Sequence, residues 1–324
     1  MIQGFDPRTG EPVGEPVAET TDAALDAIVA SALAAAPAWG AGTALARRAA
    51  ALEAVADALD DRAGELAVIA DTETALGGER LTGEVARTTV QLRMFAGVLR
   101  DGSYVDAEVT HAEGVIPDLR RINRPVGPVA VFAASNFPFA FSVAGGDTAS
   151  ALAAGCPVVV KAHEGHPVTS DVTAEVVTSA LASAGAPAGT FGLVHGVEAG
   201  LRLLRHPDIA AAGFTGSTAG GLALARICAE RPVPIPFYGE LGSVNPSVVL
   251  PGAAFSRPAQ VATGYVASLT LGVGQFCTNP GLLFVPEDVG LLSAIADSSP
   301  TSSGTKSRPG LVQNWPVPRV SDAT

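Results

Sequence analysis

The apolar positions in the first hundred residues recur at helical spacing. From Thr21 to about Ala70 the chain is alanine-rich; a threonine and an aspartate are suited to cap a first helix, and Pro37 is expected to end it. A second amphipathic run follows, with its apolar residues close to helical spacing: Leu45, Leu52, Val55, Leu59, Leu66 and Ile69. A further helix is expected over Thr82 to Leu99. This part of the chain is therefore predicted to be helical.

The pattern changes at residues 101–127, which read DGSYVDAEVTHAEGVIPDLRRINRPVG. Short β-branched pieces broken by glycine and proline are typical of an extended arm or a hairpin. Beyond Pro125, wholly apolar strand candidates (PVGPVAVFAAS, CPVVVKA, FGLVHG, AAGFTGS) alternate with helix candidates. Strands that are apolar on both faces and alternate with helices predict the α/β class, with a doubly wound parallel sheet. Ligands bind such sheets at the carboxyl ends of the strands.

Composition and charge argue against a nucleic-acid-binding, secreted or membrane protein. Charged residues make up 16% of the 324 residues and the formal net charge is −12, so we expect no nucleic-acid partner. The N-terminus lacks the basic start and apolar run of a secretory signal, and the uncharged stretch from Ile28 to Ala46 is interrupted by Pro37 and glycines, so we expect a cytoplasmic protein with no membrane segment. Residues 298–324 are rich in Ser, Pro and Thr, which predicts a disordered tail.

Three cysteines lie far apart, with no spacing that suits a disulfide framework or a metal site. Cys156 and Cys228 sit in apolar segments, as buried thiols do. Cys277, in GVGQFCTNPG, lies in a glycine- and proline-rich loop whose N–H groups can stabilise an anionic sulfur, as a nucleophile requires. A cysteine hydrolase would need a histidine base, and the sequence links none of the five histidines to Cys277. Glu240, in ELGSVNP, is another candidate base, with a solvated loop residue as the equal alternative.

Polar residues follow several predicted strands. Asn136 comes directly after one strand, Lys161 ends the next, and FTGSTAGG places Gly216, Ser217 and Gly221 at a strand-to-helix turn suited to phosphate contact. Taken singly, Asn136 is equally typical of an ordinary turn, and the short glycine motif is weak evidence for a phosphate site.

Together, SNFP, VVVKAHEGHP, FTGSTAGG, ELGSVNP and GQFCTNPG resemble, in order and spacing, the aldehyde dehydrogenase superfamily. The resemblance runs from the N-terminus to about Asp297 and is greatest to the branch that contains α-ketoglutarate semialdehyde dehydrogenases. It implies a Rossmann-like cofactor-binding domain over 1–104 and 124–241, an oligomerisation arm over 105–123, and an incomplete second α/β catalytic domain over 242–297.

The resemblance also implies a chemistry. Cys277 would attack the aldehyde carbon, the Asn136 amide would hold the resulting oxyanion, and Glu240, as a buried carboxylate, would activate the water that hydrolyses the thioester. The cofactor-binding residues would be Ser135, Lys161, Glu164, Gly216, Ser217 and Gly221. An acidic Glu164 would bond a ribose 2′-hydroxyl and repel a 2′-phosphate, so NAD is favoured, with NADP possible.

The resemblance fails at the C-terminal end. Family members continue for over a hundred residues past the nucleophile, through an E-x-F-G-P motif that this sequence lacks, so we expect a C-terminally truncated chain. The substrate is expected to be a small aldehyde such as an oxo-acid semialdehyde, and full-length relatives are homo-oligomers. The alternative hypothesis is a catalytically impaired, dinucleotide-binding remnant.

Overall fold

The computed structural model describes residues 1–115, 117–286 and 290–299. The chain divides into two compact units, Met1–Leu241 and Gly242–Thr324. Most of the tail predicted to be disordered lies outside the described residues, and Ser298 is the last residue of helix α11 (Leu291–Ser298).

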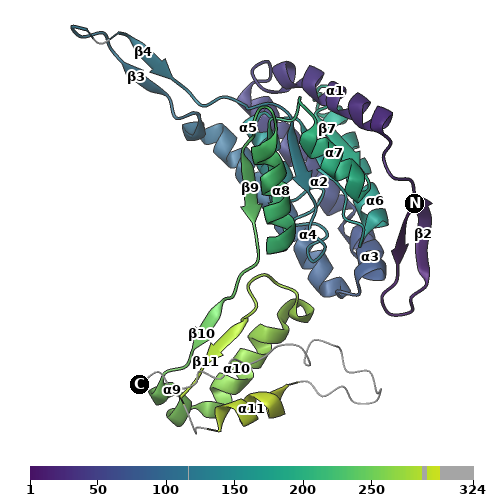
Figure 1. Ribbon diagram of the computed structural model, residues 1–324, viewed down its shortest axis with the longest axis vertical. Coiled ribbons are helices and arrows are strands. Elements are labelled where there is room, and N and C mark those ends of the chain that lie inside the picture. Colours follow the sequence, from purple (N-terminus) through teal and green to yellow (C-terminus); the bar gives the residue numbers. More distant parts are fainter. Residues whose placement is uncertain (116, 287–289, 300–324) are drawn as a thin grey trace. The chain divides into compact units, whose positions relative to one another are not determined.

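A five-stranded parallel sheet forms the centre of the first unit (Figure 1). The strand order is β7-β6-β5-β8-β9, so the chain winds outward from β5 in one direction and then resumes on its other side at β8. The strands are β5 (Val129–Phe132), β6 (Val158–Lys161), β7 (Phe191–Val194), β8 (Ala211–Thr215) and β9 (Phe237–Glu240). All neighbours are parallel, so their carboxyl ends lie along one edge of the sheet. The predicted doubly wound α/β fold is confirmed.

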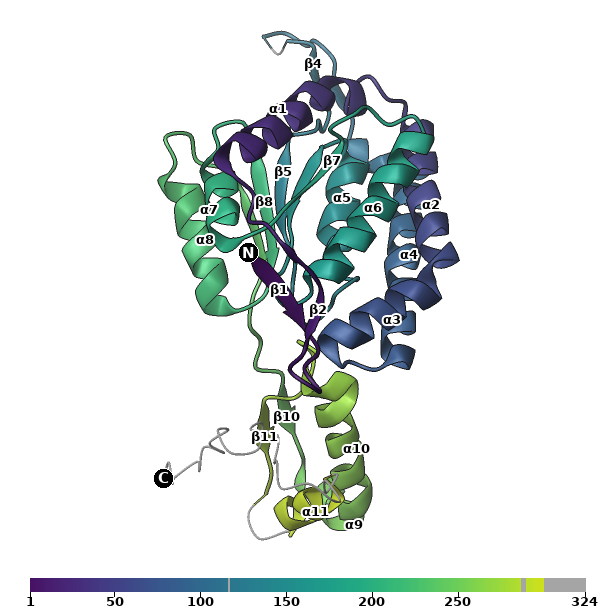
Figure 2. The same cartoon turned by 90° about the vertical axis from the view of Figure 1, so that its right-hand side faces the viewer.

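Helices cover both faces of this sheet (Figure 2). Alternate residues of β5 belong to different cores: Val129 and Val131 pack into one, Ala130 and Phe132 into the other. The first core receives α2 (Leu45–Asp61), α3 (Ala63–Thr74), α4 (Gly78–Asp101), α5 (Gly146–Ala154) and α6 (Pro167–Ser183). The second receives α1 (Asp22–Trp39), α7 (Val197–Arg205) and α8 (Thr218–Glu230). This two-sided burial is why the strands are continuously apolar.

The helix boundaries differ from the prediction at two places. Helix α1 continues past Pro37 to Trp39, because the Trp39 ring is buried and its indole N–H donates to the Leu152 carbonyl (3.1 Å). The second helical run is divided at Arg62 into α2 and α3.

Helix α1 also has the length and apolar composition of a membrane span. In this structure its Leu25 and Val29 pack into the second core.

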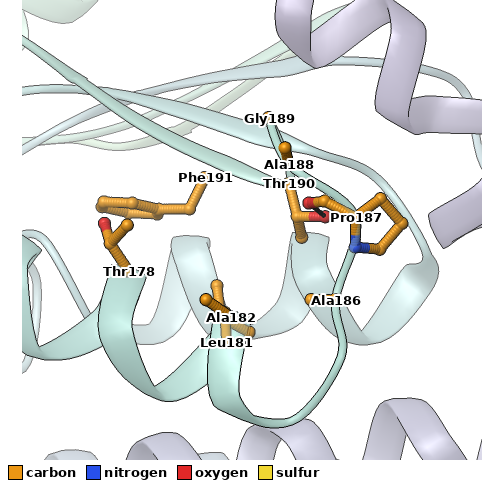
Figure 3. A pocket seen from close by; sticks show the side chains of 9 residues that line it. All are labelled: Thr178, Leu181, Ala182, Ala186, Pro187, Ala188, Gly189, Thr190 and Phe191. Carbon is orange, nitrogen blue, oxygen red and sulfur yellow. Dashed lines mark hydrogen bonds between the residues drawn. The ribbon is translucent and has the colours of Figure 1, made fainter.

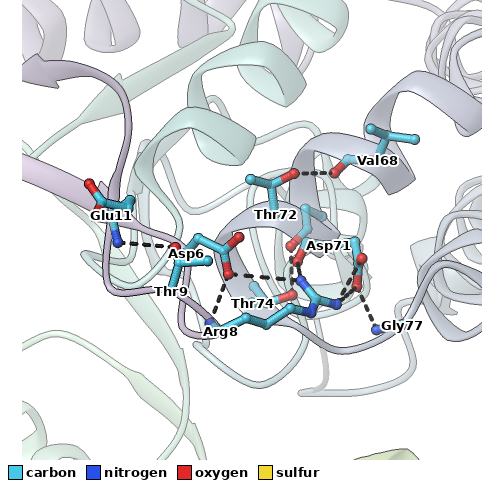
Figure 4. Close-up of polar contacts among 10 residues, drawn as sticks. Asp6, Arg8, Thr9, Glu11, Val68, Asp71, Thr72, Thr74 and Gly77 are labelled. Atoms are coloured by element: carbon cyan, nitrogen blue, oxygen red, sulfur yellow. Dashed lines mark hydrogen bonds and ion pairs between the residues drawn. The ribbon is translucent and has the colours of Figure 1, made fainter.

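The N-terminal hairpin of β1 (Ile2–Phe5) and β2 (Pro12–Val17) forms hydrogen bonds with α3. Figure 4 shows the contact: the Arg8 guanidinium donates to the Asp71 carboxylate (2.9 Å) and to the Asp71 carbonyl (2.8 Å). Asp71 Oδ1 also accepts the Gly77 N–H (2.7 Å) at the start of α4. One carboxylate therefore links the hairpin to the α3–α4 corner.

The predicted arm is a second hairpin, which projects from the first unit (Figure 1). After the short 3₁₀ helix η1 (Ser103–Val105), β3 (Glu108–Thr110) pairs antiparallel with β4 (Leu119–Arg121). Val109 and Leu119 are both more than half exposed, which leaves apolar surface on this hairpin.

The second unit contains two parallel strands and three helices among its described residues. Strand β10 (Pro246–Val248) pairs with β11 (Leu282–Phe284), and the helices are α9 (Pro251–Ser256), α10 (Pro258–Thr270) and α11. A small core of Ala254, Ala262 and Leu291 joins them. The 3₁₀ segment η2 (Leu271–Gly274) leads into the Cys277 loop.

Candidate active site

Asn136 lies in the bend that follows β5, at the carboxyl edge of the sheet. Ser135 is exposed and Asn136 is half-buried. The bend is closed at its base by a bond from the Ala134 N–H to the Phe141 carbonyl (2.8 Å), and its three phenylalanines are largely buried. The short bend therefore presents Asn136 from a packed base.

Lys161 ends β6, one strand away on the same edge. The residue is 7% exposed, and the stem of its side chain packs against α7 where Gly200 has no side chain: a Cβ there would lie 2.9 Å from Lys161 Cγ. The Lys161 ammonium forms an ion pair with Glu164. Burial opposes ionisation of Glu164, but the hydrogen bond and charge of Lys161 outweigh it and hold the pKa of this carboxyl below its usual value. The Glu164 carboxylate is thus ionised at neutral pH.

His163 and His166, from the same segment, stack on each other with their ring centroids 5.6 Å apart, and no pattern in the sequence indicates a role for them. His166 is completely buried; its Nε2 lies 3.0 Å from the Ala134 carbonyl and its Nδ1 3.2 Å from Ser170 Oγ. Burial lowers the pKa of His166, so the ring is neutral and Nε2, facing a carbonyl, carries the hydrogen. His166 therefore joins the Lys161–Glu164 segment to the strand end that precedes Asn136.

The turn between β8 and α8 carries Gly216, Ser217 and Gly221. Ser217 caps α8, because its Oγ accepts the Gly220 N–H (3.2 Å), which leaves the hydroxyl hydrogen free to be donated outward. Gly216 N–H donates to the Glu240 carbonyl (3.0 Å). A Cβ on Gly221 would lie 2.0 Å from the end of the Leu241 side chain, which would have to move to admit it.

Glu240 is the last residue of β9 and pairs in register with Thr215. Its side chain is exposed, which differs from the buried carboxylate that the base role implies. A second acid, Asp147 in the first turn of α5, lies on the same face of the sheet: a Cβ on Gly213 would be 3.3 Å from its Oδ2. Burial and the negative charge of Glu240 raise the pKa of Asp147, and a hydrogen bond with Thr215 opposes the rise. No pattern in the sequence indicates Asp147 as a site residue.

Cys277 belongs to the second unit, where its residue is exposed, whereas Cys156 and Cys228 are buried. Burial raises the pKa of the Cys228 thiol, in keeping with an inert core cysteine. The Cys277 carbonyl accepts hydrogen bonds from Ser243 Oγ (2.6 Å) and from Asn245 Nδ2 (2.5 Å). The GSVNP part of the ELGSVNP motif therefore meets the GQFCTNPG motif within this unit.

Asparagine side chains hold the Cys277 loop through further hydrogen bonds to backbone carbonyls. Asn279 Nδ2 donates to the carbonyls of Leu269 (3.0 Å) and Leu271 (3.1 Å), and the Asn279 carbonyl accepts from Asn245 Nδ2 (3.0 Å). Val273 has a φ of 61°, which a β-branched side chain rarely adopts. The cysteine thus lies on a loop held in an unusual conformation by several hydrogen bonds.

The structure brings Ser135, Asn136, Lys161, Glu164, Ser217 and Glu240 to one edge of the first unit's sheet, and it places Cys277 in the second unit. A small recess lies at the opposite edge, where the turn before β7 meets the end of α6 (Figure 3). Its lining is mostly apolar and includes none of these residues. Over the described residues, no three His, Cys, Asp or Glu side chains are grouped as a metal site.

Residues 1–295 match the model of the aldehyde dehydrogenase family. The chain is 52% identical over 246 residues to alpha-ketoglutaric semialdehyde dehydrogenase 2 of Azospirillum brasilense, which covers 74% of this chain and 47% of that protein. It is 48% identical over 237 residues to alpha-ketoglutaric semialdehyde dehydrogenase of Acinetobacter baylyi, covering 72% and 45%.

Among solved structures, the chain is similar to a mutant of aldehyde dehydrogenase C from Pseudomonas syringae in complex with NAD⁺ and octanal. The TM-score is 0.78 at 26% identity, and the alignment covers 92% of this chain and 58% of that one. This chain spans about half the length of the curated relatives it matches.

Proposed function

Since the chain belongs to the aldehyde dehydrogenase family, we propose that it binds NAD or NADP and oxidises a small aldehyde to its carboxylic acid. The observation that carries the proposal is the gathering of Asn136, Lys161 and Ser217 at the carboxyl edge of the sheet. The order in which strands are added to the sheet reverses between β5 and β8. Doubly wound sheets bind ligands in the crevice between the loops that follow two such strands.

The residues at this edge fit a dinucleotide by their chemistry. Lys161 and Glu164 supply a buried cation and a carboxylate that can bond the hydroxyls of a ribose. The start of α8 offers the Ser217 hydroxyl hydrogen and first-turn N–H groups to a pyrophosphate. The negative Glu164 favours NAD over NADP, because a 2′-phosphate would lie against like charge.

In the proposed reaction the Cys277 thiolate adds to the aldehyde carbon, and the carbonyl oxygen becomes an oxyanion. The Asn136 side-chain amide donates to that oxyanion, an interaction often worth about 3 kcal/mol. Bound NAD or NADP, held by Lys161, Glu164 and Ser217, would supply the hydride acceptor for oxidation of this adduct to a thioester on Cys277. Glu240 takes a proton from water as the water attacks the thioester carbon, the carbon–sulfur bond breaks, and the carboxylic acid and the Cys277 thiolate are released.

For the substrate, we propose an oxo-acid semialdehyde of the α-ketoglutaric type. The support is the identity of about half the aligned positions with two relatives that carry this name.

We also propose that the β3–β4 hairpin contacts a second copy of the chain, since it projects from the first unit with Val109 and Leu119 exposed. Light scattering of the wild type and of Val109→Asp tests this contact, and an unchanged mass would contradict it.

The test of the function is production of reduced nicotinamide, followed by its absorbance, from a panel of aldehydes with NAD or NADP. We expect turnover with NAD and an oxo-acid semialdehyde, none with Cys277→Ala, and wild-type turnover with the matched control Cys228→Ala. Dinucleotide binding without turnover would favour the impaired-remnant hypothesis. Cleavage of esters or amides with no dinucleotide present would favour a cysteine hydrolase.

A further inference from the structure

Three charged residues of α4 face the bend that carries Asn136. Arg80, Glu84 and Arg87 are spaced four and three residues apart, so they share one side of the helix. Glu84 lies among the buried residues Leu81 and Val85, at a position where the helical period calls for an apolar side chain. A carboxylate at such a position needs a reason beyond packing, because burying a charge is unfavourable unless hydrogen bonds compensate.

The Glu84 carboxylate is bound to the backbone of the bend. Its Oε1 accepts the N–H groups of Phe139 (2.8 Å) and Ala140 (3.0 Å), and the residue is 5% exposed. Its Oε2 lies 3.9 Å from the Arg80 guanidinium. Burial raises the pKa of Glu84, while the two N–H groups and the nearby arginines oppose the rise. The carboxylate thus meets two amides that no strand or helix bond satisfies.

The two arginines hold the other side of the bend. Arg80 donates to the Asn136 carbonyl (2.5 Å) and its guanidinium lies 5.2 Å from the centre of the Phe137 ring. The Arg87 guanidinium lies 4.9 Å from the centre of the Phe141 ring. The residues from Asn136 to Phe141 are therefore held at both ends and in the middle by a single helix.

We propose that Glu84 is a positioning residue for Asn136: by fixing the N–H groups of Phe139 and Ala140, it holds the bend in the one conformation from which the Asn136 amide can donate to a developing oxyanion. The catalytic part of this inference rests on the proposed function. Glu84 touches neither substrate nor cofactor, and it acts only through the backbone of the bend. Loss of Glu84 should therefore slow attack and hydride loss while leaving dinucleotide binding intact.

Four variants of the full chain separate the possibilities. Glu84→Gln keeps an oxygen that can accept both N–H groups, whereas Glu84→Leu removes it. Glu84→Asp keeps the charge but withdraws the oxygen by about 1.5 Å, one carbon–carbon bond. Glu73→Leu is the matched control, because Glu73 is also a buried carboxylate that accepts backbone N–H groups, those of Val168 and Thr169, and it lies on α3.

Two measurements are made on each variant. The first is single-turnover formation of reduced nicotinamide, together with the dissociation constant for NAD. The second is amide hydrogen exchange of the peptide that contains residues 136–141. For Glu84→Leu we expect the single-turnover rate to fall by about 100-fold, the loss typical of one oxyanion donor, with the NAD dissociation constant within about twofold and faster exchange of the bend. Glu84→Gln should restore both rate and exchange, and Glu73→Leu should change neither.

The double variant of Glu84→Leu with Asn136→Ala identifies the route of the effect. If Glu84 acts through Asn136, the double variant is no slower than Asn136→Ala alone. An equal loss in the Asn136→Ala background, or wild-type rate and exchange in Glu84→Leu, would overturn the proposal. Should Glu84→Leu not fold, Glu84→Asp gives the same comparison.

Failure of the proposed function would be visible separately. If the wild type forms no reduced nicotinamide, that function is wrong, and exchange alone decides whether Glu84 holds the bend. Faster exchange in Glu84→Leu that Glu84→Gln reverses would support the positioning role, and unchanged exchange would refute it.

Discussion

Acidification should destabilise the first unit through His163, which stacks on His166 and accepts the Gly165 N–H at its Nδ1 (3.0 Å). Burial, followed by the electrostatic effects of the neighbouring His166 and Lys161, lowers the pKa of His163 from 6.5 to about 4, and the charge of Glu164 only partly opposes this. The unfolded chain therefore binds a proton at His163 more tightly than the folded chain does. Stability must fall as the pH falls between these two values.

The size of the effect follows from the shift. One pKa unit corresponds to about 1.4 kcal/mol, so a shift of roughly 2.5 units lowers the free energy of unfolding by about 3 kcal/mol between pH 7 and pH 4. His163→Asn isolates this contribution, because the asparagine oxygen can accept the Gly165 N–H near the place of Nδ1 and does not titrate. His111→Asn is the matched control, since His111 is exposed between β3 and β4.

The assay is urea unfolding followed by the fluorescence of Trp39, which is buried in the first unit's core. A Trp315→Phe background makes Trp39 the sole tryptophan. We expect the wild type and His111→Asn to lose about 3 kcal/mol more than His163→Asn over this pH range. The same pH dependence in all three proteins would refute the assignment of a half-buried, neutral His163.

Three further results are expected. Iodoacetamide near neutral pH should label Cys277 faster than the buried Cys156 and Cys228, and mass-spectrometric mapping that found either of those first would reverse the assignment of the nucleophile. Glu164→Thr should bind NADP better relative to NAD than the wild type does; titrations showing that the wild type already prefers NADP would contradict the role given to this carboxylate. Glu73→Leu should lower the free energy of unfolding by about 3 kcal/mol, because buried N–H groups at the start of α6 lose their acceptor; an unchanged urea midpoint would argue against that role.

The sheet and the positions at its edge could be predicted from the sequence for a physical reason. A strand buried on both faces is a continuous apolar run, and a polar residue that interrupts the run marks the strand's end. Lys161 and Asn136 were found in this way, and the structure places both at the carboxyl edge. Glu240, the last residue of the edge strand β9, is exposed in the structure, and its role as a base stays a prediction.

The supporting contacts could not be predicted, because their partners are distant in the sequence. Glu84 binds N–H groups 55 and 56 residues away, and His166 binds a carbonyl 32 residues away. One signal for Glu84 was present: a carboxylate within the apolar period of α4, next to Leu81 and Val85, is unfavourable without a buried partner. The helical period of the sequence indicates that the position is buried, but the groups that the carboxylate contacts there can be identified only from the fold.

In the proposed reaction Cys277 carries the acyl group during aldehyde oxidation. The most direct test of this step is mass spectrometry of the protein quenched with acid during reaction with NAD and an oxo-acid semialdehyde, in the wild type and in Glu240→Gln. We predict an acyl group on the peptide that contains Cys277, at greater occupancy in Glu240→Gln because hydrolysis of the thioester is slowed. An acyl group on Cys156 or Cys228, or turnover with no acyl group on Cys277 in either protein, would contradict the account.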